Sequence, residues 1–382
     1  MENTTLYKKY CVDFNQNFYT YTREELEQFK EKLTPDQISD MANIVEEIFT
    51  YGVQSVTFDR PDFVSQLDKH QYFSLSSYFY PDTDPTKEWI RKDGHVNPES
   101  IMYAKSGLRK TSMVLNLGSI MYYLTGDKKY YELMKEHIKS FFLNEETKML
   151  PNLNYAQIVV NHPKYGTGRG SGIVDFSSNM GYAFVMIKHL YDLGMFEEDL
   201  YNDLKAWTKE LLVWLETHPN AHFERDTMNN HGTIFMLLMT QLYFFVGELD
   251  EKKDSLIAGV NKHLVQIDEE GRMDEELLRT RALAYSAMNF KSYVDAYKLL
   301  DVNYVEIEAL KNAFKFLLPV YNNEITIQDV KVSDNGELRG CEQMEGTYPE
   351  HFKLYLMHLA KNFGLDLKVE SSEDVHYKYL FL

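Results

Sequence analysis

The sequence predicts an all-α fold, an incomplete barrel of antiparallel helical hairpins of the kind called an (α/α) toroid. Apolar residues recur at helical spacing through most of the 382 residues, and short links at 125–127 and 194–196 join predicted helices. Short links between long helices make consecutive helices antiparallel neighbours. The segment 234–246 is apolar nearly all round, as expected for an inner helix, whereas 197–216 is amphipathic, as expected for an outer one.

Local signals predict the individual elements. Thr34 is a capping residue, Pro35 suits the first helical position, and Gln37 stands three residues after the cap, so a helix is predicted over 35–51. Residues 324–332 alternate well enough to predict one short strand. Further helices are predicted over 100–124, 128–142, 175–193, 197–216, 230–247, 250–266, 272–298, 303–318 and 349–363.

Two long irregular stretches, 52–99 and 147–174, interrupt the helices, and loops of this length without their own structure are usually functional. The second carries four glycines around Arg169. It lacks the strand-then-helix context of a nucleotide-binding loop, so it indicates a flexible or closely approached backbone. No linker or change of composition divides the chain, which predicts a single domain over 1–382.

Composition narrows the function classes. A net charge of −18 argues against nucleic acid as a partner. No apolar run is long enough to span a membrane, and 1–22 contains no apolar core of a secretory signal. The expected location is therefore cytoplasmic as written, or periplasmic or secreted if a leader has been removed. Cys11 and Cys341 offer neither a disulfide framework nor metal-ligand spacing, and no metal or cofactor is expected.

Polar side chains begin one predicted apolar helix. Asn229, Asn230 and His231 lead directly into 234–246. Buried polar groups are costly without partners, and the start of a helix offers free N–H groups that favour an anion such as a carboxylate. In the alternative reading, one asparagine simply caps the helix and His231 is a satisfied buried histidine.

A second predicted helix carries two arginines and a tyrosine. Arg281 and Tyr285 are four residues apart, which puts them on one helical face, and a guanidinium beside a phenol favours the phenolate that a base requires. Arg279 points elsewhere on an ideal helix and needs a cap or a kink to join them. Both arginines could instead form structural ion pairs with Glu275 or Glu276.

Together these stretches resemble the alginate lyase family of polysaccharide lyases, whose fold is an (α/α) toroid. The resemblance covers about residues 70 to 300, with the motifs in the family order. The matching stretches are SLSSYFYPD (74–82), IRKDGHVNPES (90–100), YYLTGDKKY (122–130), NLNYAQ (152–157), TGRG (167–170), NNHGT (229–233) and RTRALAY (279–285).

The resemblance implies eliminative cleavage of a uronic-acid polymer. Asn230 and an arginine would neutralise the carboxylate of the reacting sugar and so acidify its C5 proton. Tyr285 would protonate the departing oxygen, and either Tyr285 in a syn elimination or His231 in an anti elimination would take the C5 proton. The family's arginine lies seven residues before the tyrosine, where this chain has a leucine. Motif order therefore favours Arg279 and helix geometry favours Arg281, the other arginine being left to bind substrate.

Other residues are expected to contact the substrate. Tyr155, Gln157 and Arg169 match family segments, and Tyr78 lies in a stretch that could be a lid over the cleft or a packed brace. On the predicted helix 100–124, the cations Lys105, Arg109 and Lys110 are interpreted as a solvated face, with substrate carboxylates as the alternative ligands.

Two other functions remain open at this level. A toroid glycoside hydrolase would need two carboxyl groups about 6.5–9.5 Å apart, and Glu224, Asp226 and Asp175 are candidates outside any supporting motif. A non-catalytic carbohydrate-binding protein could retain the toroid without the chemistry, although the complete set of asparagine, histidine, arginine and tyrosine argues against it. The expected partner is an acidic polysaccharide or oligosaccharide.

Overall fold

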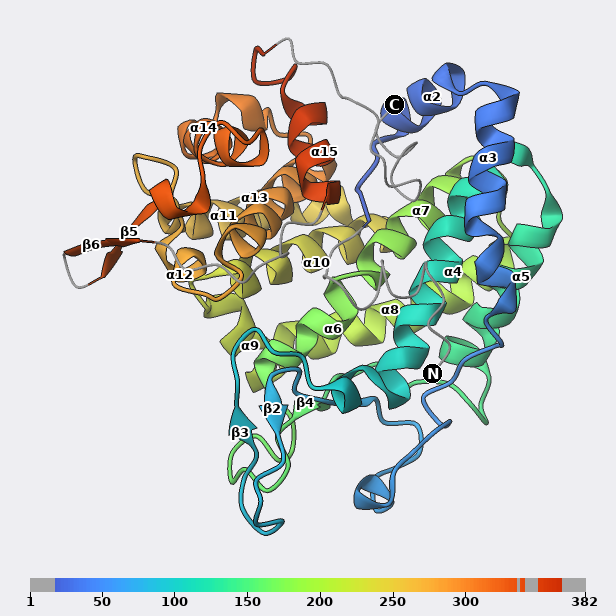
Figure 1. Ribbon diagram of the computed structural model, residues 1–382. Coiled ribbons are helices and arrows are strands. Elements are labelled where there is room, and N and C mark those ends of the chain that lie inside the picture. Colours follow the sequence, from blue (N-terminus) through green and yellow to red (C-terminus); the bar gives the residue numbers. More distant parts are fainter. Residues whose placement is uncertain (1–17, 335–336, 341–349, 366–382) are drawn as a thin grey trace. The chain divides into compact units, whose positions relative to one another are not determined.

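The computed structural model describes residues 18–334, 337–340 and 350–365 (Figure 1). These residues form two compact units. Unit 1 contains 18–19, 34–226 and 241–250, and unit 2 contains 20–33, 227–240 and the described residues from 251 onward. The single domain over 1–382 stays a prediction. Cys11 and Cys341 lie outside the described residues.

Unit 1 is built around α4 (Tyr103–Thr125), a long helix that is buried nearly all round and packs against α5 and α7. It ends at Gly126, which is left-handed with φ 69°, and Asp127 then caps α5, so the predicted short link is confirmed. The other elements of the unit are α3 (Pro35–Val45), α5 (Lys128–Ile138), a π-helical turn (Lys139–Leu143), α6 (Val174–Ser177), α7 (Met180–Asp192), α8 (Glu198–Thr217) and α9 (Pro219–Asp226), with 3-10 turns at Glu46–Thr50, Asp62–Val64, Pro98–Ile101 and Gly170–Ile173.

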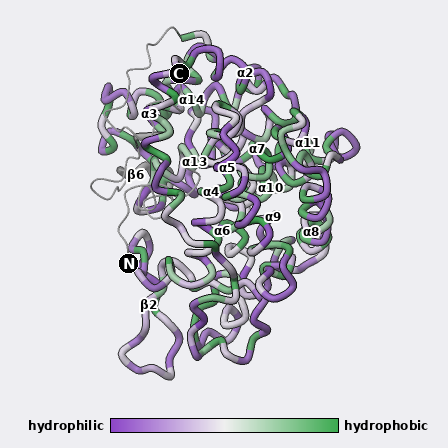
Figure 2. Tube along the Cα trace, turned by 90° about the vertical axis from the view of Figure 1, so that its right-hand side faces the viewer, coloured by the Kyte–Doolittle hydropathy of each residue, from purple (hydrophilic) through white to green (hydrophobic). Residues whose placement is uncertain are grey.

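The local signals act as expected. Thr34 and Gln37 form the reciprocal capping box at the start of α3, with Pro35 at the first helical position. Helix α8 buries one face and exposes its charged residues, and this alternation of hydrophobic and hydrophilic positions is visible along its trace in Figure 2. The amphipathic character predicted for 197–216 is therefore confirmed.

Short strands connect the two irregular stretches, for which the sequence predicts no secondary structure. Strand β1 (Phe73–Leu75) pairs in parallel with β4 (Tyr155–Ile158), and β2 (Phe79–Tyr80) pairs antiparallel with β3 (Ile90–Arg91). Strands of two to four residues carry too little alternation to be recognised from a sequence. The pairing of β1 with β4 brings together segments about 80 residues apart in the chain.

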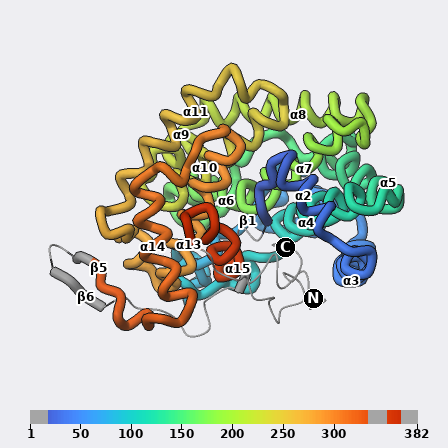
Figure 3. Tube along the Cα trace, turned by 90° about the horizontal axis from the view of Figure 1, so that it is seen from above, coloured from blue at the N-terminus to red at the C-terminus, as the bar shows by residue number. Residues whose placement is uncertain are grey.

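Unit 2 contains a cluster of three helices, α13 (Ala282–Leu299), α14 (Glu308–Tyr321) and α15 (Glu350–Leu359), which pack against one another (Figures 1 and 3). Helix α10 (Asn230–Val246) passes from unit 2 into unit 1 after Thr240, and Ile234 to Tyr243 are all buried, as predicted for an inner helix. The remaining elements are α2 (Arg23–Lys32), most of α11 (Leu249–His263), α12 (Asp274–Leu277), β5 (Lys331–Asp334) and β6 (Glu337–Gly340), with 3-10 turns at Leu264–Gln266, Tyr304–Glu306 and Ile327–Asp329.

Five predictions about elements need correction. The strand predicted over 324–332 begins only at Lys331, because a capping box between Thr326 and Asp329 closes a 3-10 turn over 327–329. The continuous helices predicted over 175–193 and 272–298 are both broken, the first between α6 and α7 and the second between α12 and α13. Helices α2 and α9 were missed, although Thr22 and Glu25 form a capping box at the start of α2. Among the described residues, no helix is both long and apolar enough to cross a membrane.

A buried histidine in unit 1 makes the stability of the fold dependent on pH. The His137 side chain is fully buried on α5, and burial lowers its pKa from 6.5 to about 4, opposed by a weaker contribution from the Tyr51 backbone. Between pH 6.5 and about 4, His137 is therefore protonated in the unfolded chain and neutral in the folded chain. As pH falls through that window, His137 alone lowers the free energy of unfolding by about 3 kcal/mol, since one pKa unit corresponds to about 1.36 kcal/mol.

We expect His137→Leu to flatten the loss of unfolding free energy between pH 6.5 and 4, because the variant has no group there that must be protonated on unfolding. Urea unfolding at several pH values in this window measures the slope. His222→Leu, which changes a less buried histidine in the same unit, is the control and should retain the wild-type slope. A wild-type slope in His137→Leu would contradict the assignment.

Candidate active site

The start of α10 in unit 2 is fixed by a buried carboxylate. The Asn230 backbone N–H donates to Glu276 Oε1 and the Asn230 side-chain Nδ2 donates to Glu276 Oε2, both at 2.6 Å, and both residues are 1% exposed. The capping proposed for an asparagine falls to Asn229, whose Oδ1 accepts from the His231 N–H at 2.9 Å. Asn230 is therefore oriented by a specific partner and is not simply a helix cap.

Glu276 also connects the other candidate residues electrostatically. Burial raises the pKa of its carboxyl, and the opposing contributions come from the Asn230 N–H, the Arg279 guanidinium, the Asn230 amide and His231. This carboxylate thus lies within electrostatic reach of three of the four predicted catalytic residues. From the sequence, Glu276 was interpreted only as an ion-pair partner. The sequence does contain a signal for this role, because a carboxylate three residues before Arg279, in a segment predicted to be buried, requires polar partners.

The break between α12 and α13 brings Arg279 to Tyr285. The Arg279 guanidinium carbon lies 4.3 Å from the centre of the Tyr285 ring, and Tyr285 is 7% exposed in the first turn of α13. Arg281 precedes the first helical residue, with φ −115° and ψ 48°, and its carbonyl accepts the Tyr285 N–H at 3.0 Å. The prediction that Arg281 and Tyr285 share a helical face is wrong, because Arg281 is not helical. The kink that Arg279 required is present.

Gly232 allows this region to pack closely. A Cβ at Gly232 would lie 2.1 Å from the Thr227 carbonyl oxygen and 2.5 Å from the His263 ring. No other residue fits between these groups without displacing backbone. The glycine of the NNHGT stretch therefore has a structural function, which is to hold the first turn of α10 against α11.

In unit 1, Asp175 organises a second buried polar cluster. Its carboxylate accepts from Lys105 Nζ at 2.9 Å, Tyr72 Oη at 3.1 Å, Ser74 Oγ at 2.5 Å and Gln157 Nε2 at 2.9 Å. Burial raises the pKa of this carboxyl, but Lys105 and the hydrogen bonds outweigh it, so that the pKa stays below its ordinary value. A carboxylate with four donors is an unsuitable proton donor, which removes support for Asp175 as a hydrolytic acid.

The other hydrolase candidates gain no support either. Asp226 is exposed and pairs with its neighbour Arg225 at 2.9 Å, while the buried Glu224 lies within electrostatic reach of the Arg169 guanidinium, which favours its charged form. The predicted solvated face on helix 100–124 is also wrong for two of its three members. Lys105 and Arg109 are 2% and 7% exposed. Lys105 is buried because its ammonium group forms an ion pair with the buried Asp175 carboxylate.

Gln157 connects this cluster to Arg169. Its Oε1 accepts from Arg169 Nη2 at 2.7 Å while its Nε2 donates to Asp175, so both ends of the amide are assigned. Its backbone has φ 50°, a left-handed conformation that costs on the order of 1–3 kcal/mol for a residue other than glycine and persists only where surrounding contacts enforce it. Gln157 is therefore a residue that positions Arg169.

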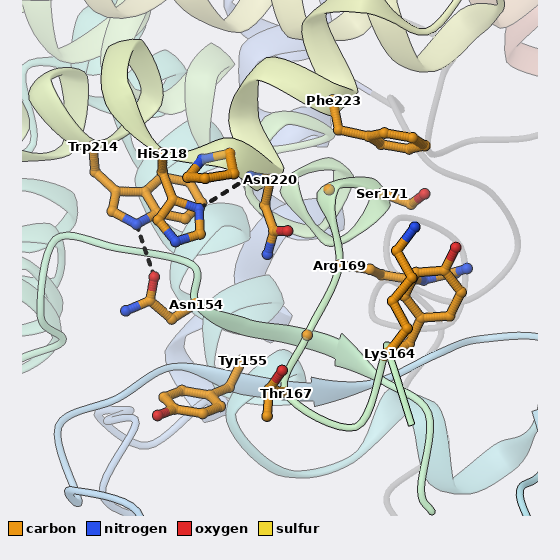
Figure 4. Close-up of a pocket in the computed structure, with 14 residues that line it drawn as sticks. Asn154, Tyr155, Lys164, Thr167, Arg169, Ser171, Trp214, His218, Asn220 and Phe223 are labelled. Atoms are coloured by element: carbon orange, nitrogen blue, oxygen red, sulfur yellow. Dashed lines mark hydrogen bonds between the residues drawn. The ribbon is translucent and has the colours of Figure 1, made fainter. Parts of the chain in front are cut away.

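Two of the four predicted substrate-binding residues of unit 1 line a cavity of about 690 Å³ (Figure 4). Tyr155 and Arg169 contribute to its wall, whereas Gln157 lies behind Arg169 and Tyr78 belongs to the turn before β2. The opposite wall, which was not predicted from the sequence, comes from the end of α8 and from α9. Its residues are Trp214, His218, Pro219, Asn220 and Phe223. Within the described residues no group of His, Cys, Asp and Glu side chains is arranged to hold a metal ion.

Comparison with solved structures defines the class of fold. The chain is similar to an alginate lyase from Bacteroides ovatus, with 23% identity, a TM-score of 0.77 and coverage of 95% of this chain and 99% of that one. It is also similar to alginate lyase A1-III from Sphingomonas species A1, with 12% identity, a TM-score of 0.50 and coverage of 88% and 92%. The predicted all-α, (α/α) toroid class is confirmed.

The alginate lyase family model matches residues 59–327, well over half of the sequence, and the chain belongs to this family. The protein is a polysaccharide lyase, as the resemblance implied. No curated protein matches the sequence. The match includes both the polar cluster around Glu276 and the cavity of unit 1.

We expect Glu276→Gln to lower kcat about tenfold or more, because one of the two buried Asn230 donors loses its acceptor and such a loss costs about 1–3 kcal/mol. In the wild type, protonation of Glu276 should have the same effect. Its pKa is raised above 4.5, so activity should fall at a pH above the ordinary carboxyl range.

The pH dependence of kcat separates this effect from general damage to the fold. The amide that replaces the carboxyl group in Glu276→Gln cannot titrate, so the acid limb of the variant should be displaced or absent. Glu275→Gln is the matched control, since Glu275 is the exposed neighbour, and it should leave both kcat and its acid limb unchanged. An unchanged acid limb in Glu276→Gln would refute the role of this carboxylate.

Proposed function

We propose that this lyase cleaves a polymer containing uronic acid by β-elimination, using Asn230, His231, Arg279 and Tyr285. The observation that carries the proposal is the Arg279 guanidinium 4.3 Å from the Tyr285 ring centre, in electrostatic reach of the Glu276 carboxylate that holds Asn230. A cation, an amide and a phenol are the groups that carboxylate neutralisation and proton transfer require. The two named structural relatives are alginate lyases, which is consistent with a uronate substrate.

The first requirement of the reaction is to make the C5 proton acidic. Arg279 and Asn230 neutralise the sugar carboxylate and stabilise the enolate-like charge that develops on it. The Asn230 amide has two N–H bonds, and Glu276 accepts one of them, which leaves the second for the substrate. Because Glu276 fixes the amide before substrate arrives, little reorganisation is needed as charge develops.

The second requirement is proton transfer. The positive charge of Arg279 favours the phenolate of Tyr285, which suits this residue to accept the C5 proton in a syn elimination and then to protonate the departing oxygen. In an anti elimination, His231 accepts the C5 proton and Tyr285 acts as the acid. Arg281, whose backbone caps α13, remains a candidate for binding the substrate.

A panel of polymers tests the reaction and identifies the substrate. The purified protein is mixed in turn with polymannuronate, polyguluronate, glucuronan and hyaluronan, and ultraviolet absorbance is followed. β-Elimination leaves an unsaturated uronide, so absorbance should rise with at least one polymer. New reducing ends without a rise in absorbance would contradict the proposal and indicate hydrolysis.

We expect Tyr285→Phe to reduce kcat by at least about 10²–10⁴-fold, the usual contribution of a general acid or base, because only the hydroxyl is lost. Circular dichroism should show an unchanged helical content. Tyr293→Phe, which changes another tyrosine of α13, tests whether loss of any buried hydroxyl has the same effect. A Tyr285→Phe enzyme with a rate close to wild type would exclude this residue from the chemistry.

Asn230→Ala should lower kcat more than it raises KM, by about 10²–10³-fold, because the bond from its amide strengthens as charge develops on the carboxylate. Steady-state kinetics on the best polymer of the panel separates the two parameters. A change confined to KM would instead identify Asn230 as a simple binding group.

A further inference from the structure

Unit 2 contains a group of polar side chains that the proposed reaction does not use. Gln266 is the last residue of the 3-10 turn that follows α11, and it is half-buried. Its side chain contacts Thr233, His263 and Asn289, each of which is at most 1% exposed. Burial of polar groups is costly unless they are partnered, so a buried polar group of this kind requires an explanation.

The side-chain amide of Gln266 connects two helices. On one side, its Oε1 accepts from Asn289 Nδ2 of α13 at 2.9 Å. On the other side, its Nε2 donates to Thr233 Oγ1 of α10 at 3.4 Å and lies 3.1 Å from Nδ1 of His263, the last residue of α11. Both ends of one amide are therefore engaged, and the amide joins α13 to the beginning of α10.

The two residues that Gln266 joins are in register with two candidate catalytic residues. Thr233 is three residues after Asn230 in α10, and Asn289 is four residues after Tyr285 in α13. Residues at these spacings lie on the same face of a helix, one turn apart. Gln266 thus bridges the face of α10 that carries Asn230 and the face of α13 that carries Tyr285.

The orientation of the Asn289 side chain depends on Gln266. Asn289 is fully buried, its Nδ2 donates to Gln266, and within the described residues its Oδ1 has no hydrogen-bond partner. Replacing both partners of such a bond with apolar groups of similar shape can be nearly neutral for stability. What the hydrogen bond adds is a fixed distance and angle between the two helices, which an apolar contact does not provide.

His263 extends the same constraint to the backbone next to His231. Its carbonyl accepts from Tyr293 Oη at 2.6 Å, which attaches the end of α11 to α13. Its ring packs against Gly232, where a Cβ would lie 3.0 Å from Nδ1, the atom that Gln266 contacts. The Gln266 amide therefore holds the imidazole ring against which the residue after His231 packs.

We propose that Gln266 is a positioning residue that sets the separation between Asn230 on α10 and Tyr285 on α13. The inference rests on the proposed function, in which these two side chains act on neighbouring atoms of one sugar residue. A misplacement of about 1 Å between such groups can lower a rate about 10²-fold. Glu276 orients the Asn230 amide within its own helix turn, whereas Gln266 fixes the distance from that turn to the phenol.

Gln266→Leu and Tyr297→Phe are compared by urea unfolding, and by steady-state kinetics on a polymer that the enzyme cleaves, at a temperature where both are folded. Tyr297→Phe is the matched control. Tyr297 Oη donates to Asn261 Oδ1 at 2.6 Å and so also links α13 to α11, but about three turns further along α13 than Tyr285. Both variants should be less stable than wild type. Only Gln266→Leu should lower kcat, by about tenfold or more, with KM changed less than about twofold, because the geometry matters most in the transition state.

Asn289→Leu added to Gln266→Leu separates positioning from stability. The double variant no longer buries an asparagine amide without a partner, so it should regain part of the stability that Gln266→Leu loses. Its kcat should remain low, since the directional bond is still absent. Recovery of kcat together with stability, a wild-type kcat in Gln266→Leu, or an equal loss of kcat in Tyr297→Phe would overturn the proposal.

Failure of the proposed function gives a different result. It would appear as a Tyr285→Phe enzyme with a rate close to wild type, or as no eliminative cleavage of any polymer in the panel, and either result would also remove the basis of this inference. Failure of the inference alone would leave Tyr285→Phe inactive and Gln266→Leu as active as wild type.

Discussion

The candidate active site depends on the two hydrogen bonds between Asn230 and Glu276. They give an acceptor to the Asn230 backbone N–H at the start of α10 and to its buried side-chain amide. They also connect α10 to α12, which lies 46 residues further along the chain. Without the carboxylate, two buried N–H groups would lack acceptors, at about 1–3 kcal/mol each. Without the donors, a buried charge would be uncompensated, which is costlier still. The pair is therefore stable only when both partners are present, and this requirement fixes the position of a candidate catalytic side chain.

In unit 1 a buried carboxylate also orients other polar side chains, but through a longer series of hydrogen bonds. Asp175 is buried with Lys105, orients Gln157, and through Gln157 orients Arg169. In both units a buried carboxylate determines where a neutral amide points. In unit 2 the amide itself is proposed to meet the substrate, whereas in unit 1 it transmits the orientation to a guanidinium. Buried charges of this kind contribute little net stability, so their value lies in the fixed geometry of the groups they hold.

The helical class could be predicted well from the sequence because the signals of a helix are local. The capping box at Thr34 and the continuous apolar run of α10 are properties of neighbouring residues, and both predictions are confirmed. The pairing of β1 with β4 depends on residues about 80 positions apart and on strands too short to show a period. The burial of Lys105 was likewise hidden, because a lysine on a helix looks solvated until its distant partner Asp175 is known. Glu276 and Trp214 were missed for a similar reason, since their hydrogen-bond partners Asn230 and Asn154 lie 46 and 60 residues away in the chain.

The two arginines before Tyr285 show how a local rule fails at the candidate active site. Helical spacing favoured Arg281, but it applies only inside a helix, and the chain leaves the helix between Leu277 and Ala282. On such a turn, the direction of a side chain does not follow the helical repeat of 3.6 residues. Arg279 can therefore reach the Tyr285 ring from six residues away, although the family motif places its arginine at seven. An irregular backbone tolerates a change of one residue in spacing, and in this chain the Arg279 guanidinium contacts the Tyr285 ring.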